Sequence, residues 1–429
     1  MNKIIFVLES FFPTHRAGTE VYVLNLCSYF KLKGWVVQVL VATTQKQKDY
    51  VFQDIPVFTF PVPVQATPQE LNGLVVPRGI EEFTEVLEAI QPGWVHFHSF
   101  GRAINTFHFQ RAKELGFKTA FTPHLGGNFC IKGNLRLFEQ HNCDGKVDEN
   151  RCTACFIHSK GINISLSKVV GKGIVMLTKQ NPLKKALPPA WFQANHRKQE
   201  LRRIAQYTDV IFSIAPWIQK AFQANGIENS IYLPQGISPL FFLGERNQHK
   251  PIQKTIHFLF LGRMHPIKGF HFLKQAWEEL EGNQYIRLHI LTNPSGDEMG
   301  YFGTQKSWAV KQANITWKEG FSQQEVADYL NDMDVLVLPS ISEVAPLVIL
   351  EAATRKIPTI ASDYIAMKES VVHDVNGWLF ENGNTAALKI LLQEIIDHPE
   401  KIMKVSQNIS KPYCINQVAT IIEERLLLV

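Results

Sequence analysis

The sequence is poor in several features that mark other classes of protein. Nowhere in its 429 residues does an apolar run approach the roughly eighteen residues that a membrane-spanning helix needs. The first apolar run, Ile4 to Leu8, is too short for a secretory signal peptide and is predicted to be a strand. Only six cysteines are present. We therefore expect a cytoplasmic protein whose thiols are reduced or bound to metal rather than paired in disulfides.

Charge is also scarce and weakly biased. Charged residues make up 19% of the chain and the net charge is +5, which favours an anionic substrate or an anionic membrane face. The basic residues are too dispersed to indicate nucleic-acid binding. What the chain has in quantity is apolar surface, with 45% hydrophobic residues and 29 phenylalanines. This composition indicates a packed globular protein of two or three domains.

Apolar strands and helical segments alternate along the chain in two similar halves. The first half opens with Ile4–Leu8 and the second with His257–Leu261, each followed by a loop and a helix. Such alternation predicts α/β domains with parallel sheets, whose ligands bind beyond the carboxyl ends of the strands. We predict an N-terminal domain, a C-terminal domain and a terminal helix, with boundaries at 1–245, 246–412 and 413–429.

Two loops of the second half carry the side chains best suited to a ligand. Arg263 and Lys268 lie between two glycines, directly after the strand His257–Leu261, where two cations suit a pyrophosphate. Glu343 is predicted in a loop and Glu351 in the helix that follows, a pair able to bind hydroxyl groups. The residues alone leave other interpretations open: Ser340 with Glu343 spells a capping box, and Arg263 and Lys268 fit ordinary surface cations.

In combination, these motifs resemble a known family. Gly-Arg-x-x-x-x-Lys-Gly at 262–269 and Ser-x-x-Glu-x-x-Pro-x-x-x-x-Glu at 340–351 are similar to the retaining glycosyltransferases of the GT-B fold, the glycosyl transferases of group 1. The segments Phe11–Glu20 and Thr122-Pro123-His124 are also similar. The family includes sucrose synthases and bacterial cell-envelope mannosyl- and glucosyltransferases. The resemblance implies two Rossmann-like domains that face each other across a cleft.

The resemblance also implies roles for individual residues. The donor-binding residues would be Gly18, Gly262, Arg263, Lys268, Glu343, Pro346, Leu347 and Glu351. The catalytic residues would be His124, Arg263, Lys268 and Glu343. The implied reaction is a front-face substitution in which the leaving phosphate accepts the acceptor's proton, so no cofactor is required for catalysis. The two cations would stabilise the charge on the departing diphosphate.

These features predict a retaining hexosyltransferase that moves a sugar from a UDP- or GDP-linked donor to a saccharide or lipid-linked acceptor, in cell-surface polysaccharide synthesis. A sugar-nucleotide epimerase, a phosphorylase and a catalytically inactive scaffold share the expected fold. A nicotinamide oxidoreductase fits the alternation too, but the loop Glu9–Glu20 has one glycine and cannot form G-x-G-x-x-G. A zinc-dependent nucleic-acid binder is disfavoured, because basic residues do not cluster around the cysteines.

Four cysteines fall within an expected insertion at about 125–190. They form C-x12-C-x8-C-x2-C, which predicts a structural zinc site, with His141 and His158 as substitutes for a cysteine ligand; the ligands would be Cys130, Cys143, Cys152 and Cys155. Buried free thiols or a redox pair are the alternatives. Cys27 and Cys414 are predicted to be packing residues.

The remainder of the insertion mixes lysines with apolar residues. Between Gly161 and Trp191 this pattern indicates either a peripheral contact with an anionic membrane at its inner face, or a helix with a solvated basic face.

Overall fold

The computed structural model describes residues 2–13, 15, 17–44, 49–63, 65, 67–71, 73–101, 103–180, 193–244, 255–280, 284–294 and 299–429. The chain forms two compact units. The first domain comprises Met1–Gln235 together with Ile415–Val429, and the second domain comprises Gly236–Cys414.

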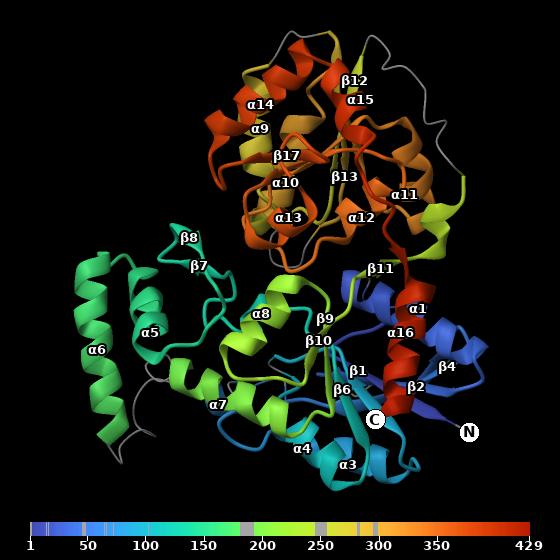
Figure 1. Cartoon of the computed structure of the whole chain (residues 1–429), viewed down its shortest axis with the longest axis vertical. Helices are drawn as coiled ribbons and strands as arrows, with labels where there is room; N and C mark the ends of the chain where they lie inside the picture. The colour runs from blue at the N-terminus through green and yellow to red at the C-terminus, as the bar shows by residue number, and fades with distance from the viewer. Residues whose placement is uncertain are drawn as a thin grey trace. The chain divides into compact units, whose positions relative to one another are not determined.

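The first domain is built on an eight-stranded sheet in the order β10-β9-β6-β5-β1-β2-β4-β3, parallel except for β3 (Figure 1). Its strands are β1 Lys3–Leu8, β2 Val36–Thr43, β3 Tyr50–Phe52, β4 Ile55–Pro61, β5 Trp94–Phe97, β6 Lys118–Phe121, β9 Val210–Ser213 and β10 Ser230–Tyr232. Its helices are α1 Gly18–Leu32, α2 Pro68–Leu71, α3 Ile80–Glu88, α4 Thr106–Glu114, η1 Gly126–Asn128, α5 Glu149–His158, α6 Ile164–Gln180, α7 Gln193–Gln206, α8 Pro216–Ala224 and α16 Ile415–Leu428.

The second domain is built on a six-stranded parallel sheet in the order β14-β13-β12-β15-β16-β17. Its strands are β12 Ile256–Leu261, β13 Ile286–Leu291, β14 Ile315–Lys318, β15 Val335–Leu338, β16 Thr359–Ser362 and β17 Gly377–Phe380, with β11 Gly236–Ile237 and β18 Tyr413–Cys414 paired apart from them. Its helices are η4 Pro239–Phe242, η5 Pro266–Lys268, α9 Phe270–Glu278, α10 Met299–Ala309, α11 Gln323–Tyr329, η7 Leu330–Asp332, α12 Leu347–Ala353, α13 Ile365–Ser370, α14 Thr385–Asp397 and α15 Glu400–Ser406.

The two sheets share one topology. Numbered along the chain, the parallel strands of the second domain run 3-2-1-4-5-6, the order of doubly wound nucleotide-binding folds. The first domain follows the same order from β4 through β1 and β5 to β9, with an extra strand at each edge. Central strands such as β15 are buried on both faces, as parallel sheets covered by helices require. The α/β prediction is therefore confirmed.

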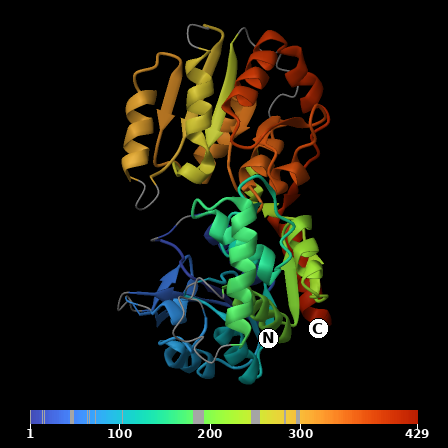
Figure 2. The same cartoon turned by 90° about the vertical axis from the view of Figure 1, so that its left-hand side faces the viewer.

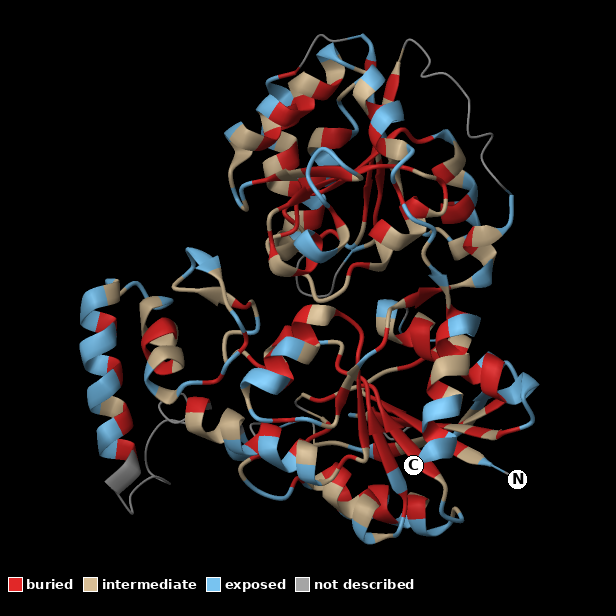
Figure 3. Ribbon diagram, in the orientation of Figure 1, coloured by how far each residue is buried: buried red, intermediate tan, exposed pale blue. Residues whose placement is uncertain are grey.

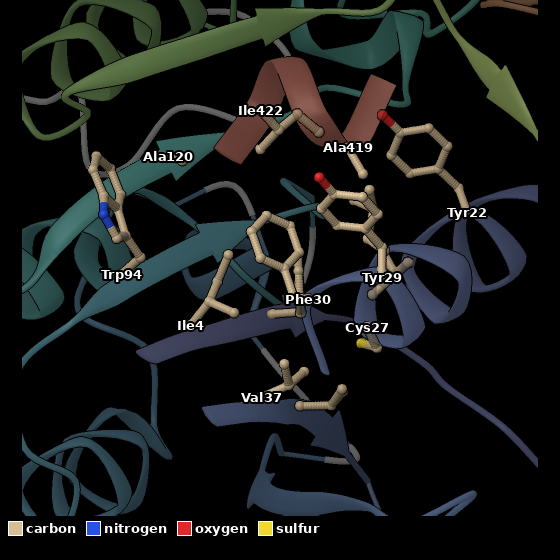
Figure 4. Packing of buried hydrophobic residues seen from close by; sticks show 14 of the residues in the cluster. Ile4, Tyr22, Cys27, Tyr29, Phe30, Val37, Trp94, Ala120, Ala419 and Ile422 are labelled. Carbon is tan, nitrogen blue, oxygen red and sulfur yellow. The ribbon is translucent and has the colours of Figure 1, made fainter. Parts of the chain in front are cut away.

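The last helix of the chain completes the core of the first domain. Ala419 and Ile422 of α16 pack with Phe30 of α1 and Ile4 of β1 in one buried cluster (Figure 4). Glu423 of α16 accepts hydrogen bonds from Tyr29 Oη at 2.9 Å and from Trp35 Nε1 at 2.8 Å. The terminal helix predicted at 413–429 thus spans Ile415–Leu428 and belongs to the first domain.

The boundary between the two domains falls between Gln235 and Gly236, earlier in the sequence than predicted. The predicted boundary at 245–246 lies outside the described residues, and residues 236–244 belong to the second domain. Two contacts account for this. β11 pairs with β18, and the buried Arg355 donates to the carbonyl oxygens of Phe241 and Leu243. Sequence periodicity shows neither contact, because both join residues more than a hundred positions apart.

An excursion leaves the first domain where the insertion is predicted. A short hairpin of β7 Arg136–Leu137 and β8 His141–Asn142 precedes α5 and α6, which pack against each other. Figure 2 shows α6 in front, on the outside of the first domain. The excursion is anchored through Asn225 after α8, whose side chain accepts from Val147 N at 2.9 Å and donates to the Gly145 carbonyl at 3.0 Å. The last residues of the predicted insertion fall within 181–192, outside the described part of the chain.

Candidate functional site

The site in the second domain lies at the point where strand order reverses. β12 is hydrogen-bonded to β13 on one side and to β15 on the other. Successive connections leave β12 and β15 toward opposite edges of the sheet, which leaves a crevice at their carboxyl ends. The loop after β12 carries Arg263 and Lys268, and the loop after β15 carries Glu343. The two loops singled out in the sequence therefore flank the position where such sheets bind ligands.

A glycine and a backbone hydrogen bond hold these two loops together. Gly269 has φ +67°, and a Cβ added there would lie 1.9 Å from the carbonyl oxygen of Pro339. Only glycine allows this approach, since any side chain would collide with the backbone of the neighbouring loop. Ile341 N donates to the carbonyl oxygen of Ile267 at 2.8 Å. The position of Lys268 is therefore fixed by β15 as well as by its own strand.

Lys268 and Glu343 form an ion pair between the loops. Lys268 Nζ lies 2.5 Å from Glu343 Oε1, with side chains 21% and 11% exposed. The fully buried Ser340 donates from Oγ to the same carboxylate oxygen at 2.9 Å. The helix begins four residues after Glu343, so Ser340 and Glu343 are not the capping box that their spacing also suggests. Their hydrogen bond instead orients the carboxylate toward Lys268.

Arg263 differs from Lys268 in its surroundings. Its side chain is exposed and has no ion pair with any residue that the structure describes. Gly262 lies before it at the end of β12. A planar guanidinium with all its donors free can bind a phosphate oxygen pair in bidentate fashion. The two predicted cations thus lie on one loop, the first available to a ligand and the second already paired with Glu343.

Glu351 lies in α12, the helix that follows the Glu343 loop. Burial raises the pKa of its carboxyl group from 4.5 to about 7. Among the described residues, none forms a hydrogen bond or ion pair with this carboxyl group. The helix begins at Leu347, with Pro346 as the capping residue in an extended conformation. A desolvated carboxyl group without a partner is suited to accept hydrogen bonds from ligand hydroxyls.

In the first domain, the loop after β1 is organised by a buried carboxylate. Glu20, 5% exposed, accepts from Ser10 Oγ at 2.6 Å and from Ala17 N at 3.0 Å. Gly18, predicted to approach the donor, is the exposed first residue of α1. Glu20 ends the segment Phe11–Glu20 that resembles the family, but no role was predicted for it. A carboxylate in the first turn of a helix after a Ser-containing loop is the signal that could have found it.

His124 lies just beyond the end of β6 and contacts a second histidine that the sequence analysis missed. His98 Nδ1 and His124 Nε2 are 3.1 Å apart, and the two rings stack with centroids 5.4 Å apart. The Tyr22 ring meets His124 edge-on at 5.4 Å. His98 follows β5 directly, so the rule that found His124, a polar residue after a parallel strand, would also have found His98.

Burial keeps this histidine pair neutral. Desolvation lowers the pKa of His124 to about 3 and that of His98 well below its usual range. With both rings neutral, one of the two facing nitrogens carries the hydrogen and the other accepts it. The proton positions of the two rings are therefore coupled, and His124 Nδ1 remains available to a ligand. A ring with so low a pKa is poorly suited to act as a general base near pH 7.

Of the four cysteines predicted to bind zinc, Cys152 and Cys155 lie in α5 and the other two precede it. Within the described ranges, no group of three or more histidine, cysteine or acidic side chains is arranged to hold a metal. The Cys155 thiol instead accepts from Phe138 N at 3.1 Å. Burial raises the pKa of Cys143, and that of Cys152 to about 12; the nearby Cys130 thiol adds to both shifts. The zinc site stays a prediction, which elemental analysis of the purified protein would test.

Comparison with known proteins supports the assignment of the second domain. Residues 244–411 match the family model described as glycosyl transferases group 1. D-inositol 3-phosphate glycosyltransferase of Pseudarthrobacter chlorophenolicus is 28% identical over 167 residues, 38% of this chain and 39% of that protein. The putative teichuronic acid biosynthesis glycosyltransferase TuaC of Bacillus subtilis is 27% identical over 170 residues, 38% of this chain and 40% of that protein. The matches thus span about two fifths of these relatives.

Solved structures resemble the whole chain. Alr3699/HepE of Anabaena, solved with UDP and glucose, has a TM-score of 0.64 at 12% identity and covers 100% of both chains. Sucrose-phosphate synthase from Thermosynechococcus elongatus has a TM-score of 0.65 at 16% identity, covering 100% of this chain and 99% of that one. These likenesses confirm the predicted GT-B fold. The match to the glycosyl transferases of group 1 covers residues 244–411, within the second domain.

Proposed function

We propose that the protein transfers a sugar, with retention of anomeric configuration, from a nucleoside diphosphate sugar to a saccharide or lipid-linked acceptor in cell-surface polysaccharide synthesis. The observation that carries this proposal is the arrangement at the strand-order switch point of the second domain. There, Lys268 and Glu343 form an ion pair between two loops, beside an exposed Arg263. Glu351 adds a carboxyl group without a partner among the described residues.

Each of these groups suits one part of the donor. Arg263 and Lys268 would bind the diphosphate, the first as a planar fork and the second as a point charge. Glu351 would accept hydrogen bonds from the ribose hydroxyls, and Glu343 would contact the transferred sugar. Pro346 and Leu347 begin the helix between these two glutamates and would line the same site with Gly262. The UDP and UDP-glucose complexes of HepE support a donor of this class.

The reaction that these residues can support is a substitution on one face of the sugar. The bond between the anomeric carbon and the diphosphate breaks while the acceptor oxygen bonds to that carbon. The acceptor's proton passes to the departing phosphate oxygen, so no protein base is needed. Arg263 and Lys268 would stabilise the charge on the leaving group, and loss of one such group costs on the order of 10²-fold in rate. In the first domain, neutral His124 would bind a sugar hydroxyl through Nδ1. No cofactor enters this scheme.

The acceptor and the setting rest on the relatives. TuaC is named for teichuronic acid biosynthesis, and CapM of Staphylococcus aureus, 24% identical over 159 residues, for capsular polysaccharide biosynthesis. We propose that the protein meets a saccharide or lipid-linked acceptor at the inner face of the membrane. No helix among the described residues is long and apolar enough to cross a membrane.

A thermal-melt panel with UDP, GDP, ADP and NAD tests the donor site directly. A nucleotide at about a hundred times its dissociation constant should stabilise the protein by roughly 2.7 kcal/mol. We expect one nucleoside diphosphate to raise the melting temperature of the wild type and of Lys274→Ala, but not of Lys268→Ala. Lys274 is a matched control, since it lies six residues further on, in α9, and pairs only loosely with Glu278, at 3.9 Å.

The panel, followed by an assay of sugar transfer with the nucleotide that binds, also separates the competing functions. Stabilisation by NAD alone would favour an oxidoreductase and overturn the donor-site assignment. Binding of a nucleoside diphosphate without sugar transfer to any saccharide or lipid-linked acceptor would favour a scaffold. Interconversion of the donor sugar without release of the nucleotide would favour an epimerase.

A further inference from the structure

Helix α6 has its small and polar residues on its buried face and its large apolar residues on its exposed face, the reverse of a helix whose outer face meets only water. The residues that α6 buries lie at the spacing of one helical face and, apart from Val175, are small or polar: Ser167, Gly171 and Thr178. A Cβ added at Gly171 would lie 3.0 Å from the backbone nitrogen of Ala154, so the two helices approach closely there. Apolar burial therefore does not explain why α6 is rich in large apolar residues.

Those large apolar side chains face outward instead. In Figure 3, α6 is mostly exposed on the side away from α5. The exposed apolar residues recur at helical spacing, with exposed fractions of 50%, 70%, 37%, 64% and 61% for Leu166, Val169, Val170, Met176 and Leu177. At about 100° per residue they form one stripe, rather than scattered positions. Contiguous exposed apolar surface of this kind marks an interaction site.

Cations border this stripe. Lys168 and Lys172, one turn apart, are exposed along one edge of it. The surrounding sequence carries the same bias, because residues 150–199 contain seven lysines and two arginines but no aspartate or glutamate. This segment thus holds nine formal positive charges in a chain whose net charge is +5. The partner of α6 must therefore be both apolar and anionic.

We propose that α6 lies in the interface of an anionic membrane, with its apolar stripe among the acyl chains and its lysines at the phosphate groups. A helix with a lysine-bordered apolar face has the pattern of an interfacial helix. It is 17 residues long, and no described helix is long and apolar enough to span a membrane, so α6 would lie in the membrane plane. Because α5 already holds it in helical form, binding needs no folding step. The proposal concerns this surface and does not depend on the proposed reaction.

Charge argues against a second copy of the chain as the occupant. A symmetric contact through the same stripe would bring Lys168 and Lys172 of both copies together, and like charges across an interface oppose association. Anionic phospholipids satisfy both requirements of the surface at once.

Co-sedimentation of the full chain with vesicles tests the proposal. We compare phosphatidylcholine vesicles with vesicles in which a third of the lipid is phosphatidylglycerol. The wild type should bind the anionic vesicles preferentially, and salt should weaken this binding. The charge variant Lys168→Glu/Lys172→Glu should bind at least about 30-fold more weakly, since each lysine near an anionic surface contributes about fivefold. The apolar variant Val169→Asp/Met176→Asp should bind at least about tenfold more weakly.

Matched controls make the result specific to α6. Lys220→Glu/Lys404→Glu changes the net charge equally at two other exposed lysines. Val310→Asp/Ile390→Asp replaces apolar residues of similar exposure, 62% and 67%, in the second domain. Both controls should bind like the wild type. Equal binding by all variants, or no binding to anionic vesicles, overturns the proposal. So does a dimer that forms without lipid and is lost in the apolar variant, since a second copy would then cover the stripe.

Discussion

Replacing Glu351 by glutamine should stabilise the second domain above neutral pH while weakening nucleotide binding. The native state holds the carboxyl proton more tightly than the unfolded state does, with a pKa of about 7 against 4.5. The native carboxyl group therefore binds more protons in this window, and its contribution to the free energy of unfolding falls as the pH rises from 4.5 to 7. Ionisation of this desolvated carboxyl group destabilises the wild-type fold. Glutamine does not ionise, so the variant keeps that stability.

The magnitude follows from the two pKa values. At 1.36 kcal/mol per pH unit, the ionised carboxylate lowers the free energy of unfolding by about 2.5 kcal/mol between pH 5 and pH 8. Glutamine leaves a buried amide, which adds a constant offset at every pH. The informative quantity is therefore the change with pH of the difference between variant and wild type, in which that offset cancels.

Denaturant unfolding at pH 5 and pH 8 measures this quantity. Relative to the wild type, Glu351→Gln should gain about 2.5 kcal/mol on going from pH 5 to pH 8. The control Glu278→Gln removes a carboxyl group that is 40% exposed on α9, so the change with pH measured for Glu351→Gln should exceed the one measured for this variant. A change for Glu351→Gln that is no larger than the control's would show that the carboxyl group is ordinarily hydrated, and would refute the reasoning.

The same variant should bind the nucleotide less well. A carboxylate that accepts hydrogen bonds from ribose hydroxyls contributes about 1.5–3 kcal/mol, so at pH 8 we expect roughly tenfold weaker binding or more. Wild-type affinity should fall as the pH drops below 7, where Glu351 becomes protonated. Calorimetric titration with the nucleotide found in the melt panel checks both expectations. Unchanged affinity would show that Glu351 does not bind the ribose hydroxyls.

Three further changes test other parts of the structure. Gly269→Ala should lower the melting temperature more than Gly320→Ala, because the two glycines share φ near +67° but only the first would place a Cβ against backbone, 1.9 Å away; equal losses would refute the clash. Glu423→Gln should cost the first domain about 2 kcal/mol in denaturant unfolding, since two hydrogen bonds to a carboxylate are weakened; no loss would show that α16 is held by apolar packing alone. The first domain should lose stability as the pH falls from 6.5 toward 3, measured by unfolding at pH 7 and pH 5, because burial lowers to about 3 the pKa values of His96, His108 and His124. Equal stability at the two pH values would contradict those pKa values.

The sequence predicts the parts of the fold that local patterns encode. Continuous apolar runs such as Val335–Leu338 appear as buried parallel strands, and the cations placed after His257–Leu261 lie at the carboxyl end of β12. Loop residues could be located because parallel strands all end at one edge of a sheet. The positions of Arg263, Lys268 and Glu343 at the switch point follow from that rule, whereas their roles stay predictions.

What the sequence does not encode locally is contact between distant segments. The ion pair of Lys268 with Glu343 depends on Gly269 meeting the backbone of Pro339, 70 residues further on. The raised pKa of Glu351 depends on burial that helix spacing cannot reveal. His98 was overlooked because its contact with His124 depends on β5 lying beside β6. Only the order of strands in the sheet establishes that neighbour. The cleft expected between the two domains stays a prediction.

The return of the chain to its first domain sets the order in which the protein can fold during synthesis. Residues 236–414 form a complete domain between Gln235 and Ile415, whereas the core of the first domain includes Ile415, Val418 and Ile422. A ribosome that has finished the first 235 residues has therefore released a sheet whose apolar face still lacks α16. The second domain, although made later, has all its core residues available first. The earliest-made part of the protein should be the last to become fully stable, and the part most dependent on chaperones until α16 has been synthesised.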